Sequence, residues 1–255
     1  MHGVFTGIRL QIVLYRQYPD SFIPLMTAPL FTIIFLMIVR NAGRADLSPY
    51  AVVAPVFISL WWFALFHGGL VVQTDRWSQT LEMHVAAPTS FAAIVYGRIL
   101  TVTAVGSLSF VEVWLVARYV LGAPVVIHHP WLLAATLVAT AFAMAATALV
   151  MTSLFVLIRN AFTLANSISF PFYVLGGVLV PVALLPGWIQ PLSKVVFLSW
   201  SADLLRASLA PGPVPDVGFR LAMIVGLAAA GFALAADLLR RVLRRIRVTG
   251  ELSLR

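Results

Sequence analysis

The charged side chains best placed to do chemistry lie in one short segment, Asp75-Arg76-Trp77-Ser78-Gln79-Thr80-Leu81-Glu82, which separates two long apolar stretches. Within the apolar stretches, His67 and Glu112 are the candidate functional residues, because ionisable groups there are costly. An intramembrane enzyme would need a convergent acid, base, nucleophile or metal ligand, and we expect these two residues at opposite depths. The pattern favours a segment that contacts another protein over a catalytic site.

Composition indicates a membrane protein. The chain has 255 residues, of which 61% are hydrophobic and only 10% are charged, whereas soluble domains carry roughly 25% charged residues. Cysteine is absent, which excludes disulfides and thiolate metal sites. His128 and His129 are adjacent and make a poor metal site, so we assign no metal ligands. The net charge of +8 is read as a sign of membrane topology, not of nucleic-acid binding.

We predict an all-α, polytopic fold with six transmembrane helices, since a span needs about 20 mostly apolar residues. The expected spans are 21–39, 49–72, 94–117, 131–158, 161–182 and 219–239. Six spans put both termini on one side of the membrane. Most of the basic residues fall on that side, which indicates that the termini and the segment 75–82 are cytoplasmic.

Two further helices are expected at the ends of the chain. Residues 1–20 predict an interfacial amphipathic helix, with Arg9 and Arg16 placed off its apolar face. That face is formed by Val4, Phe5, Ile8, Ile12, Val13 and Tyr15. The alternative is a simple extension of the first span, which Pro19 and Pro24 oppose. Residues 240–255 form a basic cytoplasmic tail that continues the last helix toward anionic headgroups.

The region 170–209 combines apolar character with breaks in the helix. Its glycines and prolines oppose one uninterrupted helix, and backbone groups freed at such breaks must be buried in protein or near water. We therefore expect a re-entrant helical region on the outer side after span five. Its candidate gating residues are the glycines and prolines Pro171, Gly176, Gly177, Pro181 and Pro186.

These features together resemble the permease subunits of ABC-2-type exporters, including the daunorubicin-resistance-like permeases of bacteria. The segment 75–82, followed by Ala87-Pro88 and Arg98, is similar to the family's acidic-Arg-x-x-Gly-Thr-Leu-Glu coupling segment. The re-entrant residues, with Trp188 and Arg206, resemble its extracellular signature, and this resemblance adds Trp188 and Arg206 to the candidate gating residues. Asp75 stands for the usual Glu, Gln79 for the usual Gly, and Ser199 where Pro is frequent; we take the first two changes as compatible with a helix.

The resemblance implies a permease of an ATP-driven exporter in the cytoplasmic membrane of a bacterium, with a transmembrane domain at 21–239. It also implies a coupling helix at about 75–88 that docks on a separate ATPase, present in two copies, which binds ATP and Mg. A second permease subunit, identical or related, completes the pathway. The expected cargo is hydrophobic or amphipathic: a drug, a lipid or a natural product.

The sequence supports that division of labour independently. It has no Gly-x-x-x-x-Gly-Lys-Ser/Thr phosphate loop and only one lysine, Lys194, so we expect no ATPase activity and no cofactor in this chain. Trp77 and Leu81 lie four residues apart, which gives the coupling segment an apolar face suited to a partner groove. An ion-coupled secondary transporter and an intramembrane enzyme are the alternatives.

Three other polar residues have local expectations. His67 is expected to hydrogen-bond between helices, and Glu112 to pair with Arg118 or another outer cation. Asp237 is expected to form an ion pair with Arg240 or Arg241 on the same helix.

Overall fold

The computed structural model describes residues 2–80, 83, 90–123, 125–156, 158 and 160–249, and this part of the chain is helical with no strands. In chain order the elements are α1 (His2–Gln17), η1 (Pro19–Phe22), α2 (Ile23–Asn41), η2 (Ala45–Leu47), α3 (Ser48–Trp62), η3 (Phe63–Gly68), α4 (Val71–Trp77), α6 (Phe91–Gly106), α7 (Ser109–Leu115), η4 (Val116–Val120), α8 (Pro130–Phe155), α9 (Ala161–Leu175), η5 (Val182–Leu184), α10 (Gln190–Ser193), α11 (Phe197–Leu209) and α12 (Val217–Thr249). The all-α prediction is thereby confirmed for the described residues.

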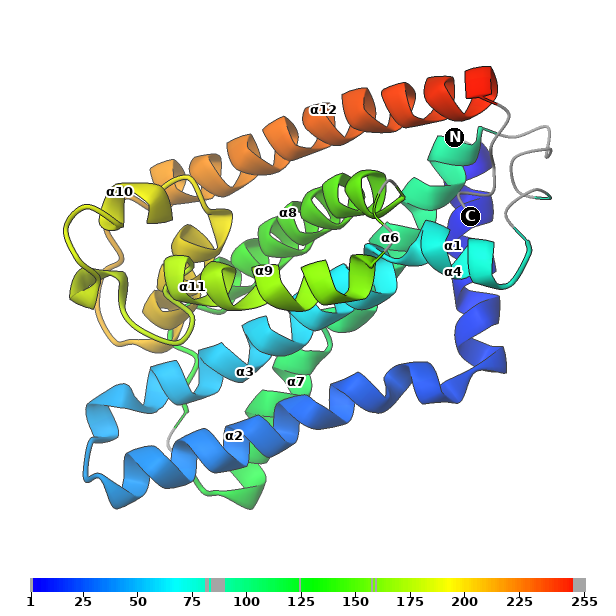
Figure 1. Cartoon of the computed structure of the whole chain (residues 1–255). Helices are drawn as coiled ribbons and strands as arrows, with labels where there is room; N and C mark the ends of the chain where they lie inside the picture. The colour runs from blue at the N-terminus through cyan, green and yellow to red at the C-terminus, as the bar shows by residue number, and fades with distance from the viewer. Residues whose placement is uncertain are drawn as a thin grey trace.

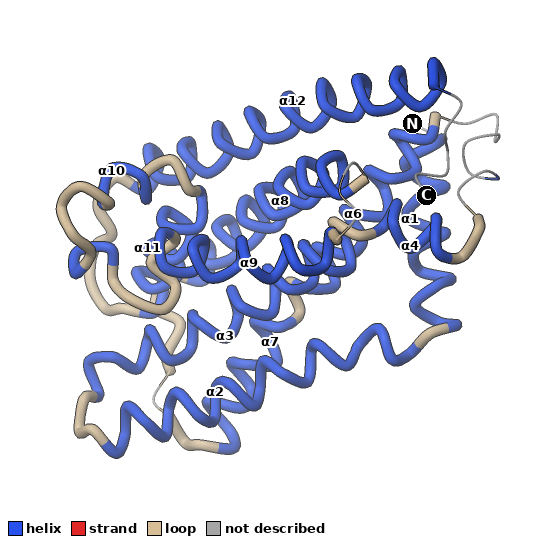
Figure 2. The backbone as a smooth tube through the Cα atoms, in the orientation of Figure 1, coloured by secondary structure: helices blue, strands red, loops and turns tan. Residues whose placement is uncertain are grey.

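The long helices form a bundle with two distinct ends. Figure 1 shows α2, α3, α8, α9 and α12 running along a common direction, with α1 set across the end where α4 and the last turns of α12 lie. The turn between α2 and α3 lies at the opposite end, together with α10 (Figures 1 and 2). Helix α8 packs against α12, α11 and α6, while α2 packs against α3 and α7.

Four helical runs among the described residues are long and apolar enough to cross a membrane: Ser48–Gly68, Phe91–Val120, Pro130–Phe155 and Val217–Val242. They correspond to the second, third, fourth and sixth expected spans. The apolar helices at the first and fifth positions, Leu25–Asn41 and Ala161–Leu175, are shorter. The count of six spans therefore stays a prediction.

Two of the spans depart from regular α-helix. The second run ends in the π-helical segment η3, and the third bends at residues 107–108 between α6 and α7 and then ends in the π-helical η4. Gly106 precedes that bend, and a Cβ there would lie 2.9 Å from the Cβ of Phe63. The absence of a side chain lets the third span approach the second closely at this point.

The fifth helix ends earlier than the apolar pattern indicates. Helix α9 stops at Leu175, not near Val182, because Gly177 adopts a φ of +62°, a left-handed conformation that favours glycine. The turn that follows is described below with the candidate site.

Bulky aromatic side chains from the second and fourth spans lie in the core. Trp61, Phe57, Phe63 and Phe155 are among the largest fully buried residues. The indole Nε1 of Trp61 donates to Ser169 Oγ of α9 at 3.0 Å, and its ring centroid lies 4.8 Å from that of Phe172. A buried indole N–H needs such a partner, so this bond joins the second span to the fifth.

Helix α1 is separated from α2 by η1, while its interfacial position stays a prediction. The packed face of α1 matches the expected one only in part. The residues turned to the interior are Gly3, Gly7, Gln11 and Tyr15, four residues apart. Tyr15 belongs to the expected apolar face, whereas Phe5, Ile12 and Val13 of that face are exposed. Backbone contact explains the choice. A Cβ added to Gly7 would overlap the carbonyl oxygen of Ile94, and one added to Gly97 would overlap that of Val4. The two glycines let α1 and α6 cross at the distance of backbone contact.

This crossing predicts a sharp difference between two glycine substitutions. Gly97→Ala should lower the free energy of unfolding by about 1–3 kcal/mol, because the new methyl group has no room against α1. Gly226→Ala in α12 is the matched control, since no atom of the described residues lies within 4 Å of its added Cβ, and the stability of this variant should be unchanged or slightly raised. Thermal unfolding of both purified variants in one detergent measures the effect. Equal unfolding temperatures for the two would contradict the close crossing.

Candidate functional site

A buried ion pair joins the predicted coupling segment to the third span. The guanidinium Nη1 of Arg98 on α6 donates to both carboxylate oxygens of Asp75 on α4, at 2.7 and 2.6 Å. The two side chains are only 4% and 6% exposed. Asp75 is therefore not a solvated loop residue. A docking contact would need an accessible side chain, and that of Asp75 is buried.

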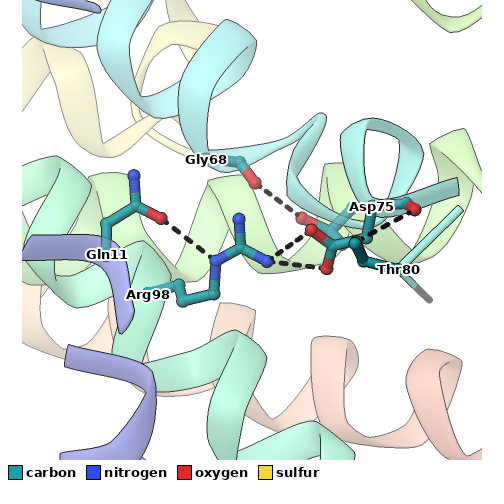
Figure 3. A network of polar contacts seen from close by, with 6 residues as sticks. Gln11, Gly68, Asp75, Thr80 and Arg98 are labelled. Atoms are coloured by element: carbon teal, nitrogen blue, oxygen red, sulfur yellow. Dashed lines mark hydrogen bonds and ion pairs between the residues drawn. The ribbon is translucent and has the colours of Figure 1, made fainter. Parts of the chain in front are cut away.

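The N-terminal helix completes this site. Arg98 Nε donates to Oε1 of Gln11 on α1 at 3.0 Å. Figure 3 shows Arg98 in the middle, reaching toward Gln11 on one side and Asp75 on the other. Tyr15 lies one turn beyond Gln11; its burial raises the pKa of the phenol to about 12, so it stays neutral at pH 7. One guanidinium thus connects α1, α4 and α6, and we call Gln11, Arg98 and Asp75 the triple junction.

The energetics of the triple junction follow from its burial. Removing one partner of a buried pair leaves an uncompensated charge, which costs about 3–5 kcal/mol. A carboxylate that accepts two hydrogen bonds from the same guanidinium is also fixed in direction. The end of α4 is therefore held rigidly against α6.

Beyond Asp75 the chain leaves the helix sooner than expected. Helix α4 ends at Trp77, and Gln79 has a φ of +57°, the left-handed conformation that glycine adopts most readily. Gln79 therefore does not occupy a helix-compatible position, and the expected helix over 75–88 is interrupted. Thr80 closes the turn through its amide, which donates to Asp75 O at 2.9 Å, and its hydroxyl, which donates to the same oxygen at 3.3 Å (Figure 3).

The remaining residues of the coupling segment point outward or lie outside the described part. Trp77 is 65% exposed, Ser78 and Gln79 are exposed, and Arg76 is half-buried. Leu81 and Glu82 lie outside the described residues. A large exposed indole at the tip of a helix whose base is fixed by a buried ion pair is a suitable contact for a partner protein.

At the opposite end of the bundle, Arg206 holds the turn after α9. The side chain is buried, and its Nη1 donates to Gly177 O at 2.9 Å. Its Nη2 pairs with Asp203 at 2.7 Å, and the guanidinium carbon lies 4.4 Å from the ring centroid of Tyr50 on α3. Arg206 thereby connects α11, the left-handed turn and the second span.

The other predicted gating residues surround this turn. Pro171 lies within α9, and Gly176 ends it where an added Cβ would be 2.6 Å from the Cβ of Leu198. Pro181 precedes η5, and Trp188 is 77% exposed between η5 and α10. Pro186 accepts backbone hydrogen bonds from residues 189 and 190. Broken helices at this end agree with the expected interruption, while their position in a membrane stays a prediction.

Hydrogen bonds from side chains to backbone fix the shape of this end. Ser199, which stands where a proline is frequent, donates to Ser193 O at 2.6 Å and so closes the turn between α10 and α11. Trp200 Nε1 donates to Lys194 O at 2.8 Å.

The rings of His128 and His129 contact the carbonyl oxygens of Leu209 and Gly212 at 2.9 and 2.8 Å. The two histidines thus bind backbone, and the described residues hold no group of three or more His, Cys, Asp or Glu that could bind a metal.

A cavity of about 280 Å³ opens beside the Arg206 turn. Its walls come from α2, α3 and the turn after α9, and include Phe35, Tyr50, Val178, Leu179 and Pro181. The lining is mostly apolar and suits an apolar group.

The isolated polar residues have mixed outcomes. The expected ion pair of Asp237 is confirmed, since Arg241 Nη2 lies 2.7 Å from its carboxylate. Glu112 is half-buried in α7 and forms no ion pair with Arg118, both of which the structure describes. His67 lies in η3 with its ring centroid 5.1 Å from that of Phe63. Its interhelical hydrogen bond stays a prediction.

Sequence reasoning missed three partners in these sites: Gln11, Asp203 and Tyr50. Gln11 carried a usable signal, because it follows Gly7 by four residues on the one polar and small face of α1. Asp203 lies three residues before Arg206, the spacing of a helical ion pair. Nothing in the sequence indicates Tyr50, which meets Arg206 only through the fold.

Comparison with known proteins gives one family. The family model of the ABC-2 type transporter matches residues 8–210, a range that holds the triple junction and the Arg206 turn. A search of curated proteins found no match.

Two aspartates provide a test of the triple junction. Asp75→Ala should lower the free energy of unfolding by about 3–5 kcal/mol, because Arg98 is left buried without its carboxylate. Asp237→Ala removes the exposed pair with Arg241 and should cost about 1 kcal/mol or less. Adding Arg98→Leu to an Asp75→Leu variant should recover part of the loss. Thermal unfolding measures all four, and the same small shift for both alanine variants would disprove the importance of the buried pair.

Proposed function

The chain belongs to the ABC-2 type transporter family, and we propose that it is the membrane-spanning permease subunit of an ATP-driven exporter. Hydrolysis of ATP takes place in a separate ATPase subunit, which binds ATP and Mg. Two ATPase copies act on two permease subunits, which are identical or related. The chain lies in the cytoplasmic membrane of a bacterium with both termini in the cytoplasm, and belongs with the daunorubicin-resistance-like permeases.

The observation that carries this proposal is the placement of exposed Trp77 two residues beyond buried Asp75. A docking contact can transmit force only if its base is rigid. The pair with Arg98 supplies that base, and Gln11 extends it to the N-terminal helix. Motion of an ATPase bound at Trp77 would therefore move α4, α6 and α1 together.

The far end of the bundle supplies the outlet in this mechanism. The chain runs from α3 through η3 and a two-residue turn at 69–70 into α4, so a shift of α4 acts on the end of the second span. Tyr50 of that span contacts Arg206, which holds the turn after α9 through Gly177. Displacing the second span would loosen this turn and widen the adjacent cavity. Its apolar walls favour a hydrophobic or amphipathic cargo such as a drug, a lipid or a natural product.

The docking step is tested at Trp77. Trp77→Ala should weaken binding of the ATPase roughly thirtyfold or more, since a central interface tryptophan contributes at least about 2 kcal/mol. Trp131→Ala is the matched control. Trp131 is also an exposed tryptophan, at 88%, but it lies at the start of α8, at the end of the bundle opposite to α4. The measurement is the amount of ATPase that co-purifies with each tagged variant from its native host. The charge reversal Arg76→Glu with Glu82→Arg should also abolish docking. Normal recovery of ATPase with both the Trp77 and the reversed variants would refute the docking site.

The gating step is tested at Arg206. Arg206→Ala should reduce export at least tenfold while ATPase docking is kept, because the turn at Gly177 loses its donor. Asp203→Asn retains the bond from Arg206 to Gly177 and should export within a few-fold of wild type. Leucine at Gly176 or Gly177 should also stop export, but it would clash with Leu198 or Val182 and so disturbs the fold as well. Transport into inverted vesicles is the measurement, and full activity of Arg206→Ala would exclude a gating role.

A further inference from the structure

A second cavity lies at the end of the bundle that carries α10, and it shares Val39 of α2 with the cavity beside the Arg206 turn. Its volume is about 450 Å³. The walls come from the last turns of α2, the start of α3 and the loop after η4, and are lined by Leu36, Met37, Val39, Arg40, Gly43, Ser48, Leu121, Gly122 and Ala123. The chain thus brings three separate segments around one hollow.

One wall carries a positive charge with no carboxylate partner among the described residues. Arg40 is exposed in the last turn of α2, and its side chain makes no hydrogen bond or ion pair with any residue that the structure describes. The nearest acidic residue in sequence, Asp46, is already engaged, because Arg44 donates to both of its oxygens at 2.9 and 2.8 Å. The guanidinium of Arg40 is therefore available to an outside anion.

Arg40 is also not used to cap its own helix. The carbonyl groups at the end of α2 accept backbone amides instead: Ala42 donates to Ile38 O at 3.0 Å and Arg44 to Val39 O at 3.1 Å. A basic side chain at a helix C-terminus often bonds these carbonyl groups. Here the backbone of the turn satisfies them, which leaves the side chain without a structural task.

The start of α3 adds to the attraction for an anion. Ser48 is the first residue of α3 and lines the cavity. The N-terminal end of a helix carries a partial positive charge and favours negative groups. The Ser48 hydroxyl can donate a hydrogen bond, so a guanidinium, a helix N-terminus and a hydroxyl border the same space.

The rest of the wall is apolar. Leu36, Met37, Val39 and Leu121 form it, and such a surface gains free energy by covering hydrocarbon. A small hydrophilic anion would use only the polar side of the cavity. An anion attached to an acyl chain would use both sides.

We propose that this cavity binds the phosphate headgroup of an anionic phospholipid. Arg40 in the last turn of α2 and Ser48 at the start of α3 contact the phosphate. The apolar wall contacts the upper part of an acyl chain. The lipid belongs to the leaflet at the α10 end of the bundle. The site stands on the geometry of this end alone and does not depend on the proposed transport cycle.

Native mass spectrometry of the full chain in a neutral detergent tests the site. Short-chain phosphatidylglycerol is titrated, and the dissociation constant of the first lipid adduct is measured. Arg40→Ala should weaken that adduct roughly tenfold or more, the usual effect of losing a charge-assisted contact. Arg40→Lys should stay within a few-fold of wild type, because the charge is kept. Ala123→Phe should also weaken the adduct by filling the apolar side while Arg40 remains.

The control removes an equivalent charge elsewhere at the same end. Arg118 is exposed in η4 and does not line the cavity, so Arg118→Ala should bind lipid as wild type does. Short-chain phosphatidylcholine should bind more weakly than phosphatidylglycerol, and inorganic phosphate alone should not bind measurably. Equal losses in Arg40→Ala and Arg118→Ala, or unchanged binding in Arg40→Ala, would overturn the site. Inorganic phosphate that binds as tightly as the lipid would overturn the lipid assignment.

Discussion

A guanidinium and a carboxylate can lie inside this helical bundle only because each neutralises the other. Arg98 and Asp75 are almost fully buried, and neither would tolerate that environment alone. Their bond holds α4 against α6 at the α1 end of the bundle. The Asp75 carboxylate accepts from Nη1 of Arg98, so Nε remains to donate a hydrogen bond to the amide oxygen of Gln11. The arrangement of helices at this end, including α1 across the bundle, is organised around one cation.

The two ends of the bundle use arginine in different ways. At the α1 end, Arg98 is buried and connects three helices. At the α10 end, Arg206 holds a backbone carbonyl and rests on an aromatic ring, whereas Arg40 faces a cavity with no partner among the described residues. The same side chain thus serves as an internal link, as a clamp on a turn and as an open binding group. Its planar fork of donors makes all three possible.

Much of this architecture could be read from the sequence, and the reasons for the exceptions are physical. Apolar length predicted the second, third, fourth and sixth spans well, since hydrocarbon burial depends on composition and not on partners. The end of α9 was misplaced because one left-handed glycine outweighs an apolar run.

The packed face of α1 was misjudged because hydrophobic periodicity finds the lipid-compatible side, while contact with α6 is decided by glycine and by Gln11. Asp75 looked like a surface charge because its partner lies 23 residues away along the chain. The Arg206 turn was recognised from its residues, but Tyr50 could be found only in three dimensions.

The π-helical segment η3 and the turn that follows it at residues 69–70 together determine which way Asp75 faces. A π-turn contains one residue more than the α-turn it replaces, and each residue of an α-helix rotates the next side chain by about 100°. Everything after Gly68 is therefore turned relative to a continuous helix that starts at Ser48. The winding is interrupted once more by the turn at residues 69–70, and α4 begins only at Val71. These two interruptions between Trp62 and Val71 direct α4 toward α6, and this direction brings the two charges face to face.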